Sequence, residues 1–165
     1  SSVIIFGIGM LLVYSFSSLY HLAQKEKTKQ LLKIADHISI YCLIAGTYSP
    51  LMVIYLNKEM ALVFLGIMWS IVFLGTFFKI FYVDRSKFIS VALYLLMGWM
   101  IVFVIKPLWG VIPFSVFLWI LAGGLSYTVG VYFYVKGHKN YFHTVWHFFV
   151  LLGTVFHYTA IFKSL

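Results

Sequence analysis

Two histidines, His143 and His147, stand four residues apart at the start of an apolar stretch near the end of the sequence. On an α-helix this spacing is about one turn, so both imidazoles share a face and can bind one metal ion. Ser17 and His21 have the same spacing at the end of the first apolar stretch, and Asp36 opens the second. Zinc accepts neutral imidazole nitrogens, and catalytic zinc sites commonly use three protein ligands with water as the fourth. The sequence therefore predicts a zinc site.

An aspartate beside such an ion can orient its water or take the proton of that water, and a serine can hydrogen-bond the water or a substrate carbonyl. We therefore assign catalytic roles to Asp36 and Ser17, and metal ligation to His21, His143 and His147. The competing interpretation is that the paired histidines only anchor a helix end at the membrane interface.

Other polar residues receive structural interpretations. His37 adjoins Asp36 but points about 100° away around a helix, which predicts a polar interface residue. His157 is ten residues past His147, about 15 Å further along the helix, which is too far for the same ion. We expect it to form an interhelical hydrogen bond. Gly123, Gly124 and Gly130 permit close helix packing or a kink.

The composition indicates which elements hold these residues. Hydrophobic residues make up 63% of the 165-residue chain and charged residues 10%, whereas soluble domains carry about 25% charged residues. Uncharged runs of 24, 21, 19, 18, 29 and 23 residues separate the charges, and a spanning helix needs roughly 20 apolar residues. We predict an all-α transmembrane bundle that forms a single domain over residues 1–165. The fifth span could begin later than residue 111. The predicted spans are 3–20, 38–56, 60–78, 88–105, 111–135 and 142–162.

The basic residues orient the chain. The loops after the first, third and fifth spans hold nine of them, against three in the remaining loops and the C-terminal end, which marks the odd loops as cytoplasmic. The polar ends of the first, second and sixth spans then lie at one depth, near the cytoplasmic face. The nine are Lys25, Lys27, Lys29, Lys33, Lys79, Arg85, Lys87, Lys136 and Lys139, and the three are Lys58, Lys106 and Lys163.

The first residue is Ser, and the first span begins almost at once. We expect one more span upstream, which would make a seven-helix core. The basic residues occupy short loops rather than one face or arm, so nucleic-acid binding is not expected. We expect an integral protein of the plasma membrane, the inner membrane in a bacterium, with membrane lipids as substrate or ligand. The oligomeric state stays open.

Three blocks of sequence resemble the hemolysin III proteins, the bacterial-type branch of the progestin and adipoQ receptor family. The blocks are SSLYHL, ADHISIYCLIAGTYSP and HTVWHFFVLLGTVFH. The resemblance implies a seven-helix core related to the alkaline ceramidases, of which this chain begins at the second helix. It also implies a zinc ion near the cytoplasmic side, held by the histidine of SxxxH and both histidines of HxxxH. These correspond to His21, His143 and His147, with Ser17 as the motif serine and Asp36 as the aspartate that contacts the zinc-bound water.

Three functions follow as hypotheses. The first is a zinc-dependent hydrolase of a lipid amide or ester bond, similar to a ceramidase. The second is a membrane receptor or sensor in which zinc is structural; four protein ligands would favour this function, and an open coordination position would favour the enzyme. The third is a pore-forming cytolysin, as the family name suggests, although no amphipathic segment stands out to line an aqueous channel.

Overall fold

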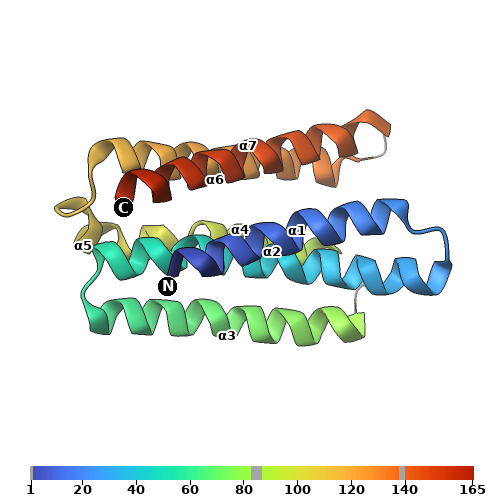
Figure 1. Ribbon diagram of the computed structural model, residues 1–165, viewed down its shortest axis with the longest axis horizontal. Coiled ribbons are helices and arrows are strands. Elements are labelled where there is room, and N and C mark those ends of the chain that lie inside the picture. Colours follow the sequence, from blue (N-terminus) through green and yellow to red (C-terminus); the bar gives the residue numbers. More distant parts are fainter. Residues whose placement is uncertain (1, 83–86, 138–139) are drawn as a thin grey trace. The chain divides into compact units, whose positions relative to one another are not determined.

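The computed structural model describes residues 2–82, 87–137 and 140–165, and the described residues form helices joined by short turns (Figure 1). Six of these helices are long and apolar enough to cross a membrane. The prediction of an all-α membrane protein with six spans in this chain is therefore confirmed. The chain contains two compact units, Ser1–Met97 and Gly98–Leu165. Arg85 and Lys139 of the predicted loops lie outside the described residues.

The first unit contains three long helices and one shorter helix. Helix α1 packs along α2, and α2 packs along α3. Close approach of α1 and α2 depends on two glycines: a Cβ at Gly9 would lie 3.0 Å from the Leu43 Cα, and one at Gly46 would lie 3.1 Å from the Ile5 carbonyl oxygen. The elements are α1 (Ser2–Leu22), α2 (Glu26–Tyr55), α3 (Lys58–Tyr82) and α4 (Lys87–Gly98).

The second unit is built on a pair of long helices. Helix α6 packs along α7, with the Ser126 hydroxyl donating a hydrogen bond to the Phe149 carbonyl at 2.9 Å. The Trp99 indole N–H donates to the Thr128 hydroxyl at 3.1 Å, which ties the start of this unit to α6. The elements are the 3₁₀ helix η1 (Met100–Val104), α5 (Ile105–Trp109), α6 (Phe114–Val135) and α7 (Asn140–Ser164).

Helix α2 differs from its predicted span because it begins at Glu26 rather than at residue 38. The additional residues are mainly Lys, Glu, Gln and Leu, which favour helix without being apolar. An apolar run therefore marks only the part of α2 that crosses the hydrocarbon. Lys79 is a second correction, since it lies inside α3 and is 1% exposed instead of occupying a loop.

The fourth span is interrupted. Helix α4 ends at Gly98, a 3₁₀ segment follows, and α5 continues past Lys106 to Trp109. Pro107 explains the irregularity, because a proline has no N–H for the preceding turn and its ring clashes with the carbonyl four residues earlier. The fifth span begins at Phe114, later than residue 111, directly after Pro113.

Candidate functional site

The two histidines of α7 form a close pair. The Nε2 atoms of His143 and His147 lie 3.0 Å apart, and their rings are nearly perpendicular with centroids 4.6 Å apart. This distance suits either an N–H···N hydrogen bond or a shared cation. Zn–N bonds of about 2.0–2.1 Å place two ligand nitrogens of a tetrahedral ion about 3.3 Å apart. The pair therefore fits two adjacent positions of a zinc ion, with each ring protonated at Nδ1.

Ser17 and Asp36 form a hydrogen-bonded pair in the first unit. The Ser17 hydroxyl on α1 donates a hydrogen bond to the half-buried Asp36 carboxylate on α2. Ser39 adds a bond one turn later, where its hydroxyl donates to the Asp36 backbone carbonyl at 2.6 Å. The serine and aspartate that the sequence assigns to catalysis are therefore partners, although they are far apart in the sequence. A carboxylate with one fixed donor keeps lone pairs available for a water molecule.

His21 lies in the last turn of α1, one turn beyond Ser17. It is exposed, and its ring packs edge-on against Tyr20 with centroids 5.0 Å apart. The Lys29 ammonium of α2 lies 5.9 Å from the centre of the same Tyr20 ring. The end of α1 and the start of α2 therefore place an imidazole, an aromatic ring and a lysine within about one to two helical turns of the Ser17–Asp36 pair.

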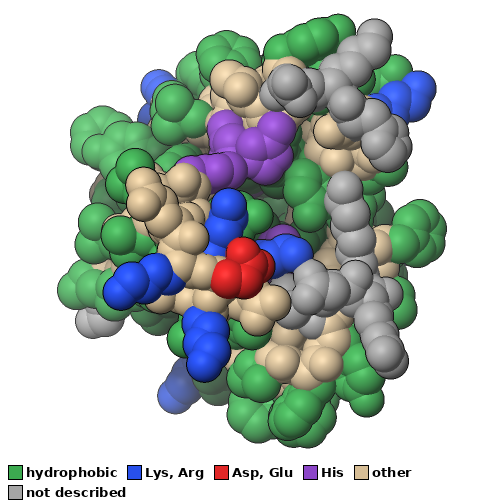
Figure 2. All heavy atoms as spheres, turned by 90° about the vertical axis from the view of Figure 1, so that its right-hand side faces the viewer, with side chains coloured by type: hydrophobic (Ala, Val, Ile, Leu, Met, Phe, Trp, Pro, Cys, Tyr) green, Lys and Arg blue, Asp and Glu red, His purple; other side chains and the backbone are tan. Residues whose placement is uncertain are grey.

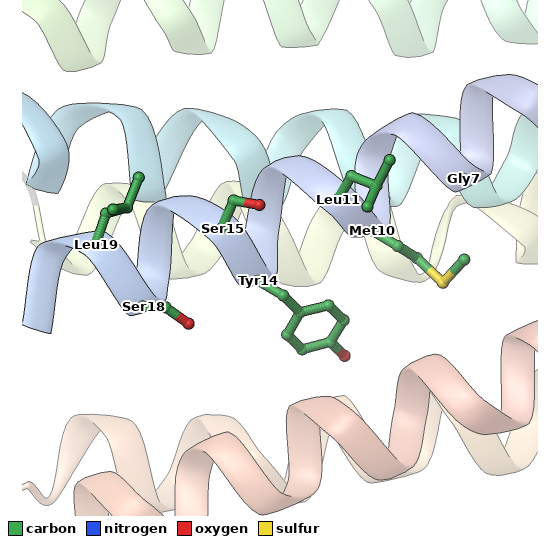
Figure 3. Close-up of a pocket in the computed structure, with 7 residues that line it drawn as sticks. All are labelled: Gly7, Met10, Leu11, Tyr14, Ser15, Ser18 and Leu19. Atoms are coloured by element: carbon green, nitrogen blue, oxygen red, sulfur yellow. The ribbon is translucent and has the colours of Figure 1, made fainter.

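A pocket on α1 contains hydroxyl groups that the sequence analysis missed. Figure 3 shows its side chains along one face of the helix, apolar toward Gly7 and richer in hydroxyls toward Leu19. The sequence did contain a signal for this pocket, because hydroxyl-bearing residues recur every three or four positions in an otherwise apolar helix. The lining residues are Gly7, Met10, Leu11, Tyr14, Ser15, Ser18 and Leu19.

His157, His37 and two glycines of α6 lie at contacts between helices. The His157 Nε2 lies 3.2 Å from the Ile120 carbonyl, which confirms the predicted interhelical hydrogen bond between α7 and α6. His37 is at the contact of α2 with α4, where the Tyr94 hydroxyl donates to its backbone carbonyl at 2.9 Å. Close packing is confirmed at two of the three glycines of α6, since a Cβ at Gly123 or Gly130 would meet α7 side chains and one at Gly124 would not.

Comparison with known proteins gives a consistent result. The family model described as "Haemolysin-III related" matches residues 1–158. The chain is 41% identical over 150 residues to the "Hemolysin-3 homolog" of Bacillus subtilis (strain 168), covering 91% of this chain and 70% of that protein. It is 39% identical over 150 residues to "Hemolysin-3" of Bacillus cereus, covering 91% and 68%.

More distant similarity extends to an animal protein. The chain is 26% identical over 167 residues to the human "Monocyte to macrophage differentiation factor", covering 98% of this chain and 69% of that protein. No solved structure matches. The family model covers nearly the whole chain, and two bacterial relatives support the same assignment. This integral membrane protein therefore belongs to the haemolysin-III-related family.

Proposed function

We propose that this protein is a zinc-dependent hydrolase that cleaves an amide or ester bond of a membrane lipid. The observation that carries the proposal is the 3.0 Å separation of the His143 and His147 Nε2 atoms, which suits two neighbouring zinc ligands. We assign the third ligand position to His21, one turn beyond Ser17 on α1. A bound zinc ion supplies Lewis acidity, which makes water a nucleophile near neutral pH.

The Ser17–Asp36 pair supplies the proton transfers. The Asp36 carboxylate holds the attacking water and accepts its proton as the oxygen adds to the substrate carbonyl. It returns that proton to the amine or alcohol that leaves when the C–N or C–O bond breaks. Because the Ser17 hydroxyl already donates to Asp36, it fixes the carboxylate orientation before the substrate arrives. A fixed orientation lowers the barrier by avoiding rearrangement during reaction.

The α1 pocket supports a lipid as substrate. It extends from Gly7 to Leu19 along the helix, which is about 18 Å by helical rise and comparable to an extended acyl chain. Its hydroxyl groups are near the C-terminal end of α1, the end of the helix that also holds Ser17 and His21. An acyl chain in this pocket would place its carbonyl at the height of those residues along the axis of α1.

The first test is zinc content per chain, measured by elemental analysis of detergent-purified protein. We expect about one zinc in the wild type and little in the His143→Ala, His147→Ala double variant, because removal of two ligands abolishes tight binding. His157→Gln is the matched control, since it changes a histidine of the same helix that takes no part in the proposed site. No zinc in the wild type, or unchanged zinc in the double variant, would refute the ligand assignment.

The second test is turnover, using a screen of lipid amides and esters with the zinc-loaded protein. Replacement of Asp36 by Asn keeps the size of the side chain but removes the base, so we expect turnover to fall by at least about 100-fold with zinc retained. Full turnover in Asp36→Asn would eliminate the proposed base. Zinc held by four protein ligands, with Asp36 among them, would instead favour the receptor or sensor function.

A further inference from the structure

Three residues of α2 form a stripe that runs from the N-terminal end of the helix to the proposed catalytic carboxylate. Lys29, Lys33 and Asp36 are separated by four and three residues, the spacings that place side chains on one helix face. Lys27 belongs to the same exposed segment but lies about 180° around the helix from Asp36. Figure 2 shows several lysine side chains around one acidic side chain on the face that looks out from this end of α2.

The stripe faces the side of α2 that α1 covers. The Lys29 ammonium lies 5.9 Å from the centre of the Tyr20 ring, and Asp36 receives its hydrogen bond from Ser17. Both contacts are with the last two turns of α1. The two lysines and the carboxylate therefore line the same seam between α1 and α2.

The length of α2 indicates the depth of the stripe in the membrane. Thirty residues correspond to about 45 Å of helix, whereas the hydrocarbon core is about 30 Å thick. The excess belongs at the charged N-terminal end, because ionisable groups are costly in hydrocarbon. Lys33 lies about 4.5 Å and Lys29 about 10.5 Å beyond Asp36 along the axis, which is the depth of lipid headgroups and their aqueous border.

We propose that Lys29 and Lys33 bind the phosphate of an anionic phospholipid headgroup, and that the hydrolase therefore prefers anionic lipids to neutral ones. Charge complementarity carries this assignment: two ammonium groups lie on one face at headgroup depth, on the seam that leads to Asp36. The exposed side chains of Leu22 and Leu31, at 76% and 69%, are also at this end of the helices. Such apolar groups beside lysines are typical of a membrane interface. The preference of the hydrolase for anionic lipids rests on the proposed function, whereas binding of the headgroup by the two lysines does not.

The experiment compares Lys29→Gln with Lys27→Gln in the full chain, purified in a zwitterionic detergent. Binding of a phosphatidylglycerol with a fluorophore on its acyl chain is followed by anisotropy, against the equivalent phosphatidylcholine. One lysine near an anionic surface changes affinity about five-fold. We expect the wild type to prefer phosphatidylglycerol at least about ten-fold, Lys29→Gln to lose about five-fold of that affinity, and Lys27→Gln to lose less than about two-fold. The Lys29→Gln, Lys33→Gln double variant should remove most of the preference.

Several outcomes overturn the proposal. Equal binding of the two lipids removes the preference, and equal losses in the Lys27 and Lys29 variants reduce it to general surface charge. Displacement of the lipid by millimolar glycerol phosphate, or tighter binding of an acidic peptide than of the lipid, assigns the lysines to a soluble anion or to a protein. Zinc content and turnover are measured on the same samples. If the wild-type protein holds zinc and turns over lipid but shows no preference for phosphatidylglycerol, this inference alone is refuted. If the wild type shows the preference but holds no zinc, only the hydrolase is refuted.

Discussion

A substitution at Gly123 tests the packing of α6 on α7. A Cβ at this position would lie 2.4 Å from the Cδ2 and Nε2 atoms of the His157 ring, well inside van der Waals contact. The ring is held in place by the bond from His157 to the Ile120 carbonyl, so it has to give up that bond to make room. Gly124 is the matched control, because it is the next residue on the same helix and a Cβ there would meet none of the described residues within 4 Å.

The magnitude follows from three terms. Overpacking a well-packed contact costs about 1–3 kcal/mol, and loss of the His157 hydrogen bond adds about 1 kcal/mol. The greater helix propensity of alanine returns up to about 1 kcal/mol. We therefore expect Gly123→Ala to lower the free energy of unfolding by about 1–3 kcal/mol, and Gly124→Ala to leave it unchanged or slightly raised.

The assay is thermal unfolding in detergent, followed by tryptophan fluorescence. For a chain of this size 1 kcal/mol corresponds to about 2–4 °C, so a loss of about 1–3 kcal/mol in Gly123→Ala should lower Tm by roughly 2–12 °C. In a His157→Ala background the same substitution should cost little, since the ring it meets is gone; the coupling between the two sites should be about 2 kcal/mol. Equal Tm values for Gly123→Ala and Gly124→Ala would refute the packing argument, as would additive effects in the double variant.

Three further predictions concern other contacts. A Cβ at Gly75 of α3 would lie 2.8 Å from the Tyr41 ring, whereas one at Gly66 would meet no atom within 4 Å in the described part of the chain. We expect Gly75→Ala to lose about 1–3 kcal/mol in denaturant unfolding and Gly66→Ala to lose none. Trp99→Phe removes the bond to Thr128 and should cost about 1 kcal/mol by the same measurement, and an unchanged stability would contradict that role for the indole. A zinc chelator should lower the Tm of zinc-loaded wild type, since ligand at 100 times Kd stabilises by about 2.7 kcal/mol, and should not change the Tm of the variant without both paired histidines of α7.

Hydropathy predicted the helices well where the membrane determines them, and less well elsewhere. The six spans follow from apolar length alone, because a backbone in hydrocarbon has to satisfy its own hydrogen bonds. The first twelve residues of α2 could not be found in this way, since they are helical but charged. Lys79 was placed in a loop because a charge was treated as the end of a span, whereas α3 continues to Tyr82 and buries it. The effect of Pro107 was missed because Lys106 had already ended the predicted span.

The candidate site could also be predicted only in part from the sequence. The approach of His143 to His147 is a local property of helical spacing and could be predicted from four residues of sequence. The bond between Ser17 and Asp36 depends on how α1 packs on α2, which no local pattern specifies; only the topology and the family resemblance suggested it. The pocket hydroxyls were overlooked because serines in an apolar helix are also typical of ordinary helix packing. The ligand role of His21 stays a prediction.

The contact between Tyr127 and Gly153 has a consequence for motion within the second unit. The Tyr127 hydroxyl is hydrogen-bonded to Thr154 at 2.7 Å, and its ring fills the space where a Cβ of Gly153 would lie, 3.0 Å from two ring carbons. A 180° rotation of the ring about its long axis leaves the hydroxyl in place but sweeps both ring edges through that space. Because packed interiors have no room for such a sweep, the ring can turn only when α6 and α7 separate briefly. The rate of ring rotation, read from the NMR line shapes of a labelled Tyr127, would therefore measure how often this helical hairpin opens.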